Sequence, residues 1–148
     1  MASNHVVDLT KNPPRSPRVR LGGYVILPRM LDKGRAEVSG KAGEYHFACS
    51  LDQRFLSFTG LQPGDILDLL KAAKSDTEVL TWIREHTKLA EPEIMLWSEF
   101  QVRRSPSDIE SREHYNESLK KLAPNRDDLT TWFDLLDLDD YVSFGGAA

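Results

Sequence analysis

The sequence predicts a mainly α fold: one compact domain of about six to seven helices, an extended N-terminal arm rich in Pro and Arg, and at most one short strand. Three observations predict it. Apolar residues recur every three or four positions over most of the chain, which is the period of an amphipathic helix. Segments that cap helix starts occur repeatedly, and prolines stand where a first helical turn accepts them.

The chain is expected to form a single domain over residues 1–148, divided into an arm (1–20), a helical body (21–142) and a tail (143–148). Its 148 residues lie near the most common domain size and allow a real core. With 9 Gly, 8 Pro and 1 Cys, the composition excludes collagen, low-complexity disorder and a disulfide scaffold.

The arm is expected to be extended because of its prolines. Pro13, Pro14 and Pro17 lack backbone donors and disfavour a helix in the residues before them. We therefore expect the chain to become helical only after this segment.

The first helix is predicted over residues 25–38. Pro28 suits its first turn, and Gly40 and Gly43 would end it. An alternative is a short strand over 24–27 followed by a helix that begins at Pro28.

Beyond the first helix, residues 44–48 are expected to form a brief strand or an extended crossing, and then helix signals follow one another. Capping boxes, in which a Ser hydroxyl and a Glu or Gln side chain satisfy opposite backbone donors, occur three times. They pair Ser50 with Gln53, Ser75 with Glu78, and Ser107 with Glu110. Pro63 and Pro92 suit the starts of two more helices. Apolar residues at helical spacing over 129–136 predict a last helix that closes the core.

Charge is distributed unevenly, although the formal net charge is only -4. Residues 1–60 hold nine Lys/Arg against five Asp/Glu, whereas residues 61–148 hold ten against eighteen. The basic excess is greatest over 11–35, where seven basic residues face only Asp32, and 127–140 contains six Asp and no basic residue. These opposed blocks would attract each other within the fold or across a dimer.

The protein is expected to be cytoplasmic, without a membrane partner. Its longest uncharged stretch, Phe55 to Gly64, is ten residues, far short of the roughly 18 that cross a bilayer. Residues 1–8 lack the basic start and apolar core of a secretory signal. A single cysteine fits a reducing compartment.

The arm presents Arg15, Arg18 and Arg20 as candidate ligand-binding residues. Their planar guanidinium groups match a carboxylate or phosphate, and Gly22-Gly23 before a helix start would add backbone donors for the same anion. Arginine is equally suited to intramolecular ion pairs, so the alternative is an arm strapped across the domain and paired with the acidic C-terminal helices.

Four residues of the adjoining segments are candidate catalytic groups: Tyr24, His46, Cys49 and Asp52. Cys49 precedes a predicted helix start and has His46 close in sequence, an environment in which a thiol acts as a nucleophile. The alternative is that Cys49 is simply a small buried residue.

The sequence contains no metal-ligand spacing, dinucleotide fingerprint or phosphate loop, so we expect neither a metal nor a cofactor. The acidic balance disfavours a nucleic-acid partner. The leading hypothesis is a domain that binds a small anionic or polar ligand, with acid–base or nucleophilic enzyme chemistry as an extension. The competing hypothesis is a non-catalytic interaction or homodimerisation module that uses the basic arm and the acidic last helix.

Several segments together resemble a bacterial family named domain of unknown function 5069 (DUF5069). They are Asp8-Leu9-Thr10, Pro14-Arg15-Ser16-Pro17-Arg18, Leu21-Gly22-Gly23-Tyr24, Leu31-Asp32-Lys33, Glu44-Tyr45-His46-Phe47, Leu51-Asp52, Phe55-Leu56, Phe58, Gly60 and Val79-Leu80, with Trp82-Ile83. The resemblance covers most of the chain and is densest before Gly60. It implies a stand-alone bacterial domain and brings no activity, cofactor or catalytic residue.

Overall fold

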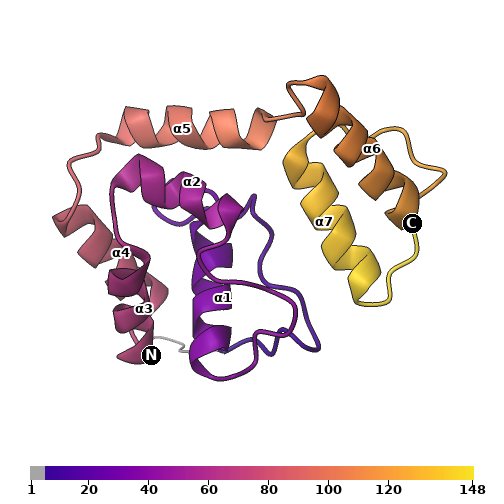
Figure 1. Ribbon diagram of the computed structural model, residues 1–148. Coiled ribbons are helices and arrows are strands. Elements are labelled where there is room, and N and C mark those ends of the chain that lie inside the picture. Colours follow the sequence, from indigo (N-terminus) through magenta and orange to yellow (C-terminus); the bar gives the residue numbers. More distant parts are fainter. Residues whose placement is uncertain (1–5) are drawn as a thin grey trace.

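The structure is a computed structural model that describes residues 6–148 and folds them into seven α-helices (Figure 1). The first five residues of the predicted arm, 1–5, lie outside the described part. The helices are α1 (Leu27–Val38), α2 (Ser50–Thr59), α3 (Pro63–Lys71), α4 (Asp76–Glu85), α5 (Glu91–Arg103), α6 (Ile109–Leu122) and α7 (Trp132–Ser143). The all-α fold class predicted from the sequence is confirmed.

The first helix begins at Leu27, two residues later than the favoured prediction. The two preceding amides are already used by distant segments: Val25 N donates to Ser98 Oγ at 3.2 Å, and Ile26 N donates to Pro17 O at 2.9 Å. Ile26 also has a φ of 73°, a left-handed conformation that a β-branched residue rarely adopts. Tertiary contacts therefore delay the helix until Pro28 can occupy its first turn.

Of the two alternatives for residues 44–48, a brief strand or an extended crossing, the strand is wrong. These residues form two successive turns, and between residues 6 and 148 the only β-type pairing is an isolated bridge between Leu21 and Tyr24. A strand needs a partner edge to satisfy its backbone groups. An all-α neighbourhood offers none, so the segment turns back on itself instead.

A capping box in the sequence predicts the N-cap correctly where no adjacent residue can serve as the cap instead. Ser75 and Glu78 form the predicted capping box of α4. At α6 the cap is Asp108, which accepts from Ser111 N at 2.7 Å, rather than the predicted Ser107. Asp and Ser are comparable as N-caps, so their order in the sequence does not decide between them.

Ser50 is also not a cap. It lies inside the first turn of α2, and Cys49 occupies the cap position without a capping hydrogen bond from its side chain. The carboxylate of Asp52 reaches back instead and accepts from Ala48 N at 2.9 Å. This places Cys49 at the very start of α2.

Helix α1 lies at the centre of the fold, with α2, α3 and the arm around it (Figure 1). Met30 and Leu31 are fully buried in a core with Phe55, Ile66 and Ile83, which come from three other helices. Gly34 lets α3 approach closely, because a Cβ at this position would overlap Leu70.

Helices α6 and α7 lie side by side beside this core and run in the same general direction, because the loop between them returns along α6 (Figure 1). The Tyr115 hydroxyl donates to Thr131 O at 2.9 Å, and the Tyr115 ring packs edge-on against Trp132. Phe133 of α7 is fully buried in the main core. The last helix thus closes the core, and it ends at Ser143, one residue beyond the predicted end of the body.

None of the helices in residues 6–148 combines the length and the apolar character that crossing a membrane requires.

Candidate functional site

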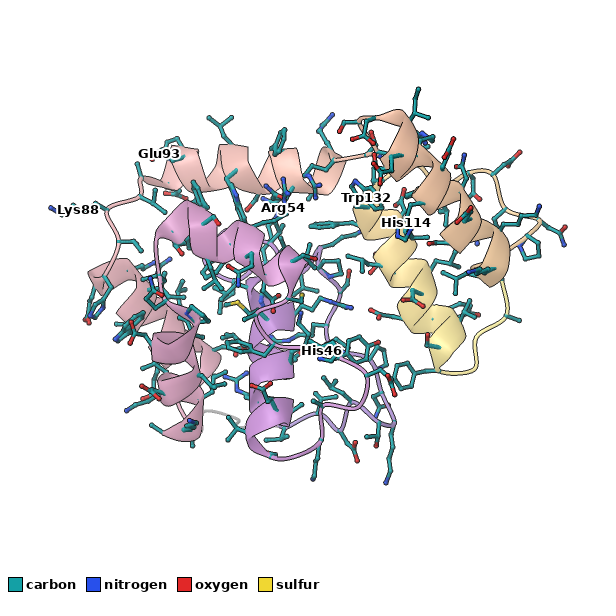
Figure 2. All side chains as sticks on the ribbon, viewed as in Figure 1. His46, Arg54, Lys88, Glu93, His114 and Trp132 are labelled. Atoms are coloured by element: carbon teal, nitrogen blue, oxygen red, sulfur yellow. The ribbon has the colours of Figure 1, made fainter. Side chains whose placement is uncertain are left out.

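A cavity of about 600 Å³ lies between α1, the turns that follow it and α7. The arm contributes Leu9 and Thr10, α1 contributes Arg29 and Lys33, and α7 contributes Leu136, Asp139 and Ser143. Figure 2 shows His46, from the turns, in the space between α1 and α7. The lining therefore combines apolar walls with a few convergent polar groups, as ligand sites do.

Lys33 is the most deeply buried charged side chain of this cavity, at 3% exposure. Its Nζ donates to Cys49 Sγ at 3.0 Å and forms an ion pair with Asp52 Oδ2 at 2.9 Å. The Lys33 ammonium thus connects the thiol at the start of α2 with a carboxylate beneath it. An ammonium beside a thiol at a helix N-terminus is an environment in which cysteines act as nucleophiles.

Asp52 is completely buried, and its environment opposes its charge. Burial raises the pKa of Asp52 above the ordinary value, and the opposing effects of Lys33 and the Ala48 amide do not cancel it. Within the described residues, Asp52 Oδ1 has no hydrogen-bond partner. Asp52 therefore holds Lys33 and the start of α2 in place at a cost in stability.

Arg29, one helical turn before Lys33, is the second buried cation of the cavity, at 4% exposure. Its guanidinium donates to both oxygens of Asp140 on α7, at 2.6 and 3.2 Å. Burial disfavours the charge on Arg29, but Asp140 outweighs this effect and raises the pKa of Arg29. The pair ties α7 to α1 at the back of the cavity.

Tyr45 completes this network from the turns. Its hydroxyl donates to Asp140 Oδ1 at 2.7 Å, and its ring lies under Arg29 and is parallel to Phe144. Burial first, and then the Asp140 carboxylate, raise the pKa of Tyr45, so the phenol stays protonated. Tyr45 and Phe144 thereby form an aromatic wall at the α7 end of the cavity.

The turns that carry Tyr45, His46 and Cys49 need unusual backbone conformations. Gly43 has a φ of 57°, and a Cβ there would lie 2.8 Å from the Leu9 carbonyl oxygen, so only glycine lets the arm pass. Ala48 has a φ of 60° and is held there by Asp52, which accepts from its amide. These two positions fold the segment so that three polar side chains face one cavity.

The predicted catalytic residues are divided between two places. His46 and Cys49 line the cavity, and Asp52 lies beneath it, joined to it through Lys33. Tyr24 lies instead in the aromatic core against Phe55, at the base of a separate cavity. Burial raises the pKa of Tyr24, and nothing brings it to the other three residues.

The predicted ligand-binding arginines are each paired with carboxylates of the chain. Arg15 forks onto Asp32 and also pairs with Asp76, both at 2.9 Å. Arg18 pairs with Asp134 and Asp137 of α7, as the strapped-arm alternative expected. The third arginine, Arg20, pairs with Glu99 of α5 at 2.6 Å. None of the three lines the cavity between α1 and α7.

Sequence reasoning missed Arg29, Lys33, Tyr45 and Asp140. In α1 the apolar spacing predicts one buried face, and it gives no sign that Arg29 and Lys33 are buried as well. One signal was available, since these two residues belong to the basic block over 11–35 that faces only Asp32. Their partners come from α2 and α7, and neither pairing has a local sequence pattern.

A family model described as "Domain of unknown function (DUF5069)" matches residues 11–142 of the chain. This range includes the arm's prolines and six complete helices, and it ends one residue before the end of α7. The residues of the cavity, apart from Leu9, Thr10, Ser143 and Phe144, lie within it. A comparison with curated proteins finds no match.

Proposed function

The chain belongs to the DUF5069 family, and from the geometry of the cavity between α1 and α7 we propose that it binds a small anionic or polar molecule there. One observation carries the proposal: two cations, Arg29 and Lys33, are at least 96% buried and still line a cavity of about 600 Å³. A volume of this size is in the range of small-ligand pockets.

The energetics favour a functional reason for these charges. Burying an ion pair costs several kcal/mol of desolvation per ion, and apolar residues of similar volume are often as stable or more stable. The pairs Arg29–Asp140 and Lys33–Asp52 therefore contribute little net stability to the fold. Their value lies in holding donor groups at fixed positions around the cavity, where a ligand oxygen can replace water.

Cys49 extends the proposal from binding to chemistry. Its sulfur accepts from Lys33 at 3.0 Å and lies at the N-terminus of α2, while His46 lines the same cavity. A ligand with an electrophilic centre next to its anionic or polar group would meet Cys49 as nucleophile and His46 as acid or base. Lys33 would position the thiol and donate to the ligand.

The binding test is a thermal-shift series with inorganic phosphate, sulfate, small mono- and dicarboxylates and neutral polyols. A compound at 100 times its Kd is expected to add about 2.7 kcal/mol of stability. The shift should vanish in Lys33→Met/Asp52→Asn and fall in His46→Ala, and it should persist in Arg20→Gln, whose pair with Glu99 lies outside the cavity. An equal shift in all four proteins would contradict the proposal.

Alkylation gives a second readout, because the chain has one cysteine and any adduct therefore reports Cys49 alone. Iodoacetamide labelling followed by intact mass should slow down when a stabilising compound is present. Protection should be weaker in His46→Ala and absent in Lys33→Met/Asp52→Asn if the compound binds in this cavity. Unchanged labelling with a bound compound would place the ligand elsewhere.

The competing hypothesis, an interaction module built on the arm and the acidic last helix, is weakened by how those charges are used. Arg18 and its α7 partners pair within the chain, and Ser16 also donates to Asp137, at 2.6 Å. A dimer would therefore need a different surface.

A further inference from the structure

Helix α5 presents apolar side chains on a face that no described part of the chain covers. Met95 is 54% exposed, Leu96 72% and Phe100 61%. In Figure 1, α5 runs along one edge of the molecule. Single exposed apolar residues are ordinary, but a contiguous row of large ones marks an interaction site.

The other face of α5 is already fully engaged. Trp97 stacks on Phe58 with ring centroids 4.8 Å apart, and Ser98 donates to Gly23 O at 2.6 Å. Gln101, one turn later, accepts from Arg54 of α2 at 2.7 Å. A helix that carries apolar residues on both faces is normally covered on both. The outer face of α5 therefore lacks a partner within residues 6–148.

The outer face has a pattern that is complementary to itself. Glu93, Leu96, Phe100 and Arg103 follow one another at spacings of three, four and three, and so form one stripe along the helix. Ser98 is the midpoint both of Glu93 and Arg103 and of Leu96 and Phe100. If a second α5 lies antiparallel across this stripe, Leu96 meets Phe100 of the second copy and Glu93 meets its Arg103.

We propose that the protein forms a twofold dimer through antiparallel α5 helices. A twofold interface is isologous, so each complementary pair occurs twice and the number of contacts doubles. Charge selects the orientation, because a parallel arrangement would place Glu93 next to Glu93 and Arg103 next to Arg103. Both ends are exposed: within residues 6–148 Glu93 accepts only from the Ala90 amide, at 3.4 Å, and the Arg103 side chain is 83% exposed with a 3.7 Å contact to Glu99.

Sedimentation equilibrium over a range of concentrations tests the dimer directly. The wild-type mass should rise from 16.8 kDa towards twice that value with increasing concentration. Leu96→Glu should remain at the monomer mass and keep its helicity, since Leu96 is mostly exposed within one chain. A wild-type mass that stays monomeric up to about 1 mM would overturn the proposal and leave a different protein as the partner of this face.

Charge reversal tests the antiparallel orientation. Glu93→Arg and Arg103→Glu should each weaken the dimer about tenfold, because each reversal opposes like charges at two symmetric positions. The double variant exchanges the charges and should restore the wild-type dissociation constant. Glu85→Arg, an exposed reversal on α4, is the control and should change nothing. A double variant no tighter than the single variants, or a dimer insensitive to Leu96→Glu, would refute this interface.

Discussion

Helix α1 keeps four charged side chains at 7% exposure or less, whereas the outer face of α5 leaves large apolar side chains more than half exposed. The two helices differ little in length, with 12 and 13 residues. In α1 every buried charge has a partner of opposite sign from another segment, such as Asp140 for Arg29. No described part of the chain covers the apolar side chains of the α5 stripe.

The comparison teaches that polarity alone does not decide where a side chain lies. A charge can be buried when a distant carboxylate compensates it, and an apolar face can be exposed when its partner is another molecule. In this protein two of the four buried charges of α1, Arg29 and Lys33, line the proposed ligand cavity, and the exposed apolar stripe of α5 forms the proposed dimer interface. These two exceptions are the observations on which the two proposals rest.

The largest expected effect comes from removing a partner of a buried charge. Asp140→Asn leaves Arg29 buried without its counter-charge, and we expect a loss of about 3–5 kcal/mol in the free energy of unfolding. Urea unfolding followed by circular dichroism measures it. The neighbouring exposed residue provides the control, since Asp139→Asn should cost less than about 0.5 kcal/mol. Equal losses in both variants would show that Arg29 does not depend on Asp140 as its counter-charge.

The second buried pair allows stability to be separated from binding. Lys33→Met alone leaves Asp52 buried as a lone carboxylate and should cost about 3 kcal/mol. Lys33→Met/Asp52→Asn should recover most of this loss, because Asn keeps an oxygen for the Ala48 amide. Urea unfolding of the single and double variants completes the cycle. A double variant as unstable as the single would mean that the pair stabilises the fold itself.

A smaller effect depends on pH through Asp76, which pairs with Arg15 and Arg35. Burial alone would raise the pKa of Asp76, but hydrogen bonds from the two arginines outweigh it and lower the pKa below 3.8. The folded state then binds fewer protons than the unfolded state, so the stabilisation is complete above pH 3.8 and is lost as the pH falls through the folded pKa.

Asp76→Asn should therefore cost about 1–2 kcal/mol at neutral pH, and this cost should shrink in acid. Asp68→Asn, on an exposed face of α3, is the control. Asp52 acts in the opposite sense: its raised pKa makes the folded state bind the proton more readily, so its contribution improves as the pH falls. A pH-independent cost for Asp76→Asn would contradict the ion pairs with the two arginines.

The smallest effect is expected on the outer face of α5. Leu96→Ala should change the unfolding free energy of the dilute monomer by less than about 0.5 kcal/mol. The same substitution at Leu70, which is 5% exposed, should cost about 2–5 kcal/mol. Thermal unfolding at low concentration provides both values. A large loss at Leu96 would mean that α5 packs against its own chain and has no free outer face.

The parts of the fold that depend on local chemistry could be predicted from the sequence. The Ser75 capping box, the proline start of α3 and the left-handed Gly60 at the end of α2 each act within a few residues. The predictions failed where a tertiary contact competes with the local signal, as at Ile26, whose amide is taken by Pro17.

The same distinction between local signals and distant contacts applies to the residues of the candidate site. His46 and Cys49 could be singled out because they are close to each other in the sequence and to a helix start. Lys33 and Arg29 could not, because the partners that allow their burial are 19 and 111 residues further along the chain. Asp140 was visible only as one of six aspartates in an acidic block.

The Arg29–Asp140 pair also sets a condition on how the protein is made. Arg29 emerges from the ribosome long before Asp140, and until α7 is synthesised the central helix has no counter-charge for its guanidinium. Domains usually fold as units during synthesis. The Arg29 charge therefore gains its counter-charge only when the last helix has been synthesised, whereas the apolar residues of α1 can pack on α2 and α3 earlier.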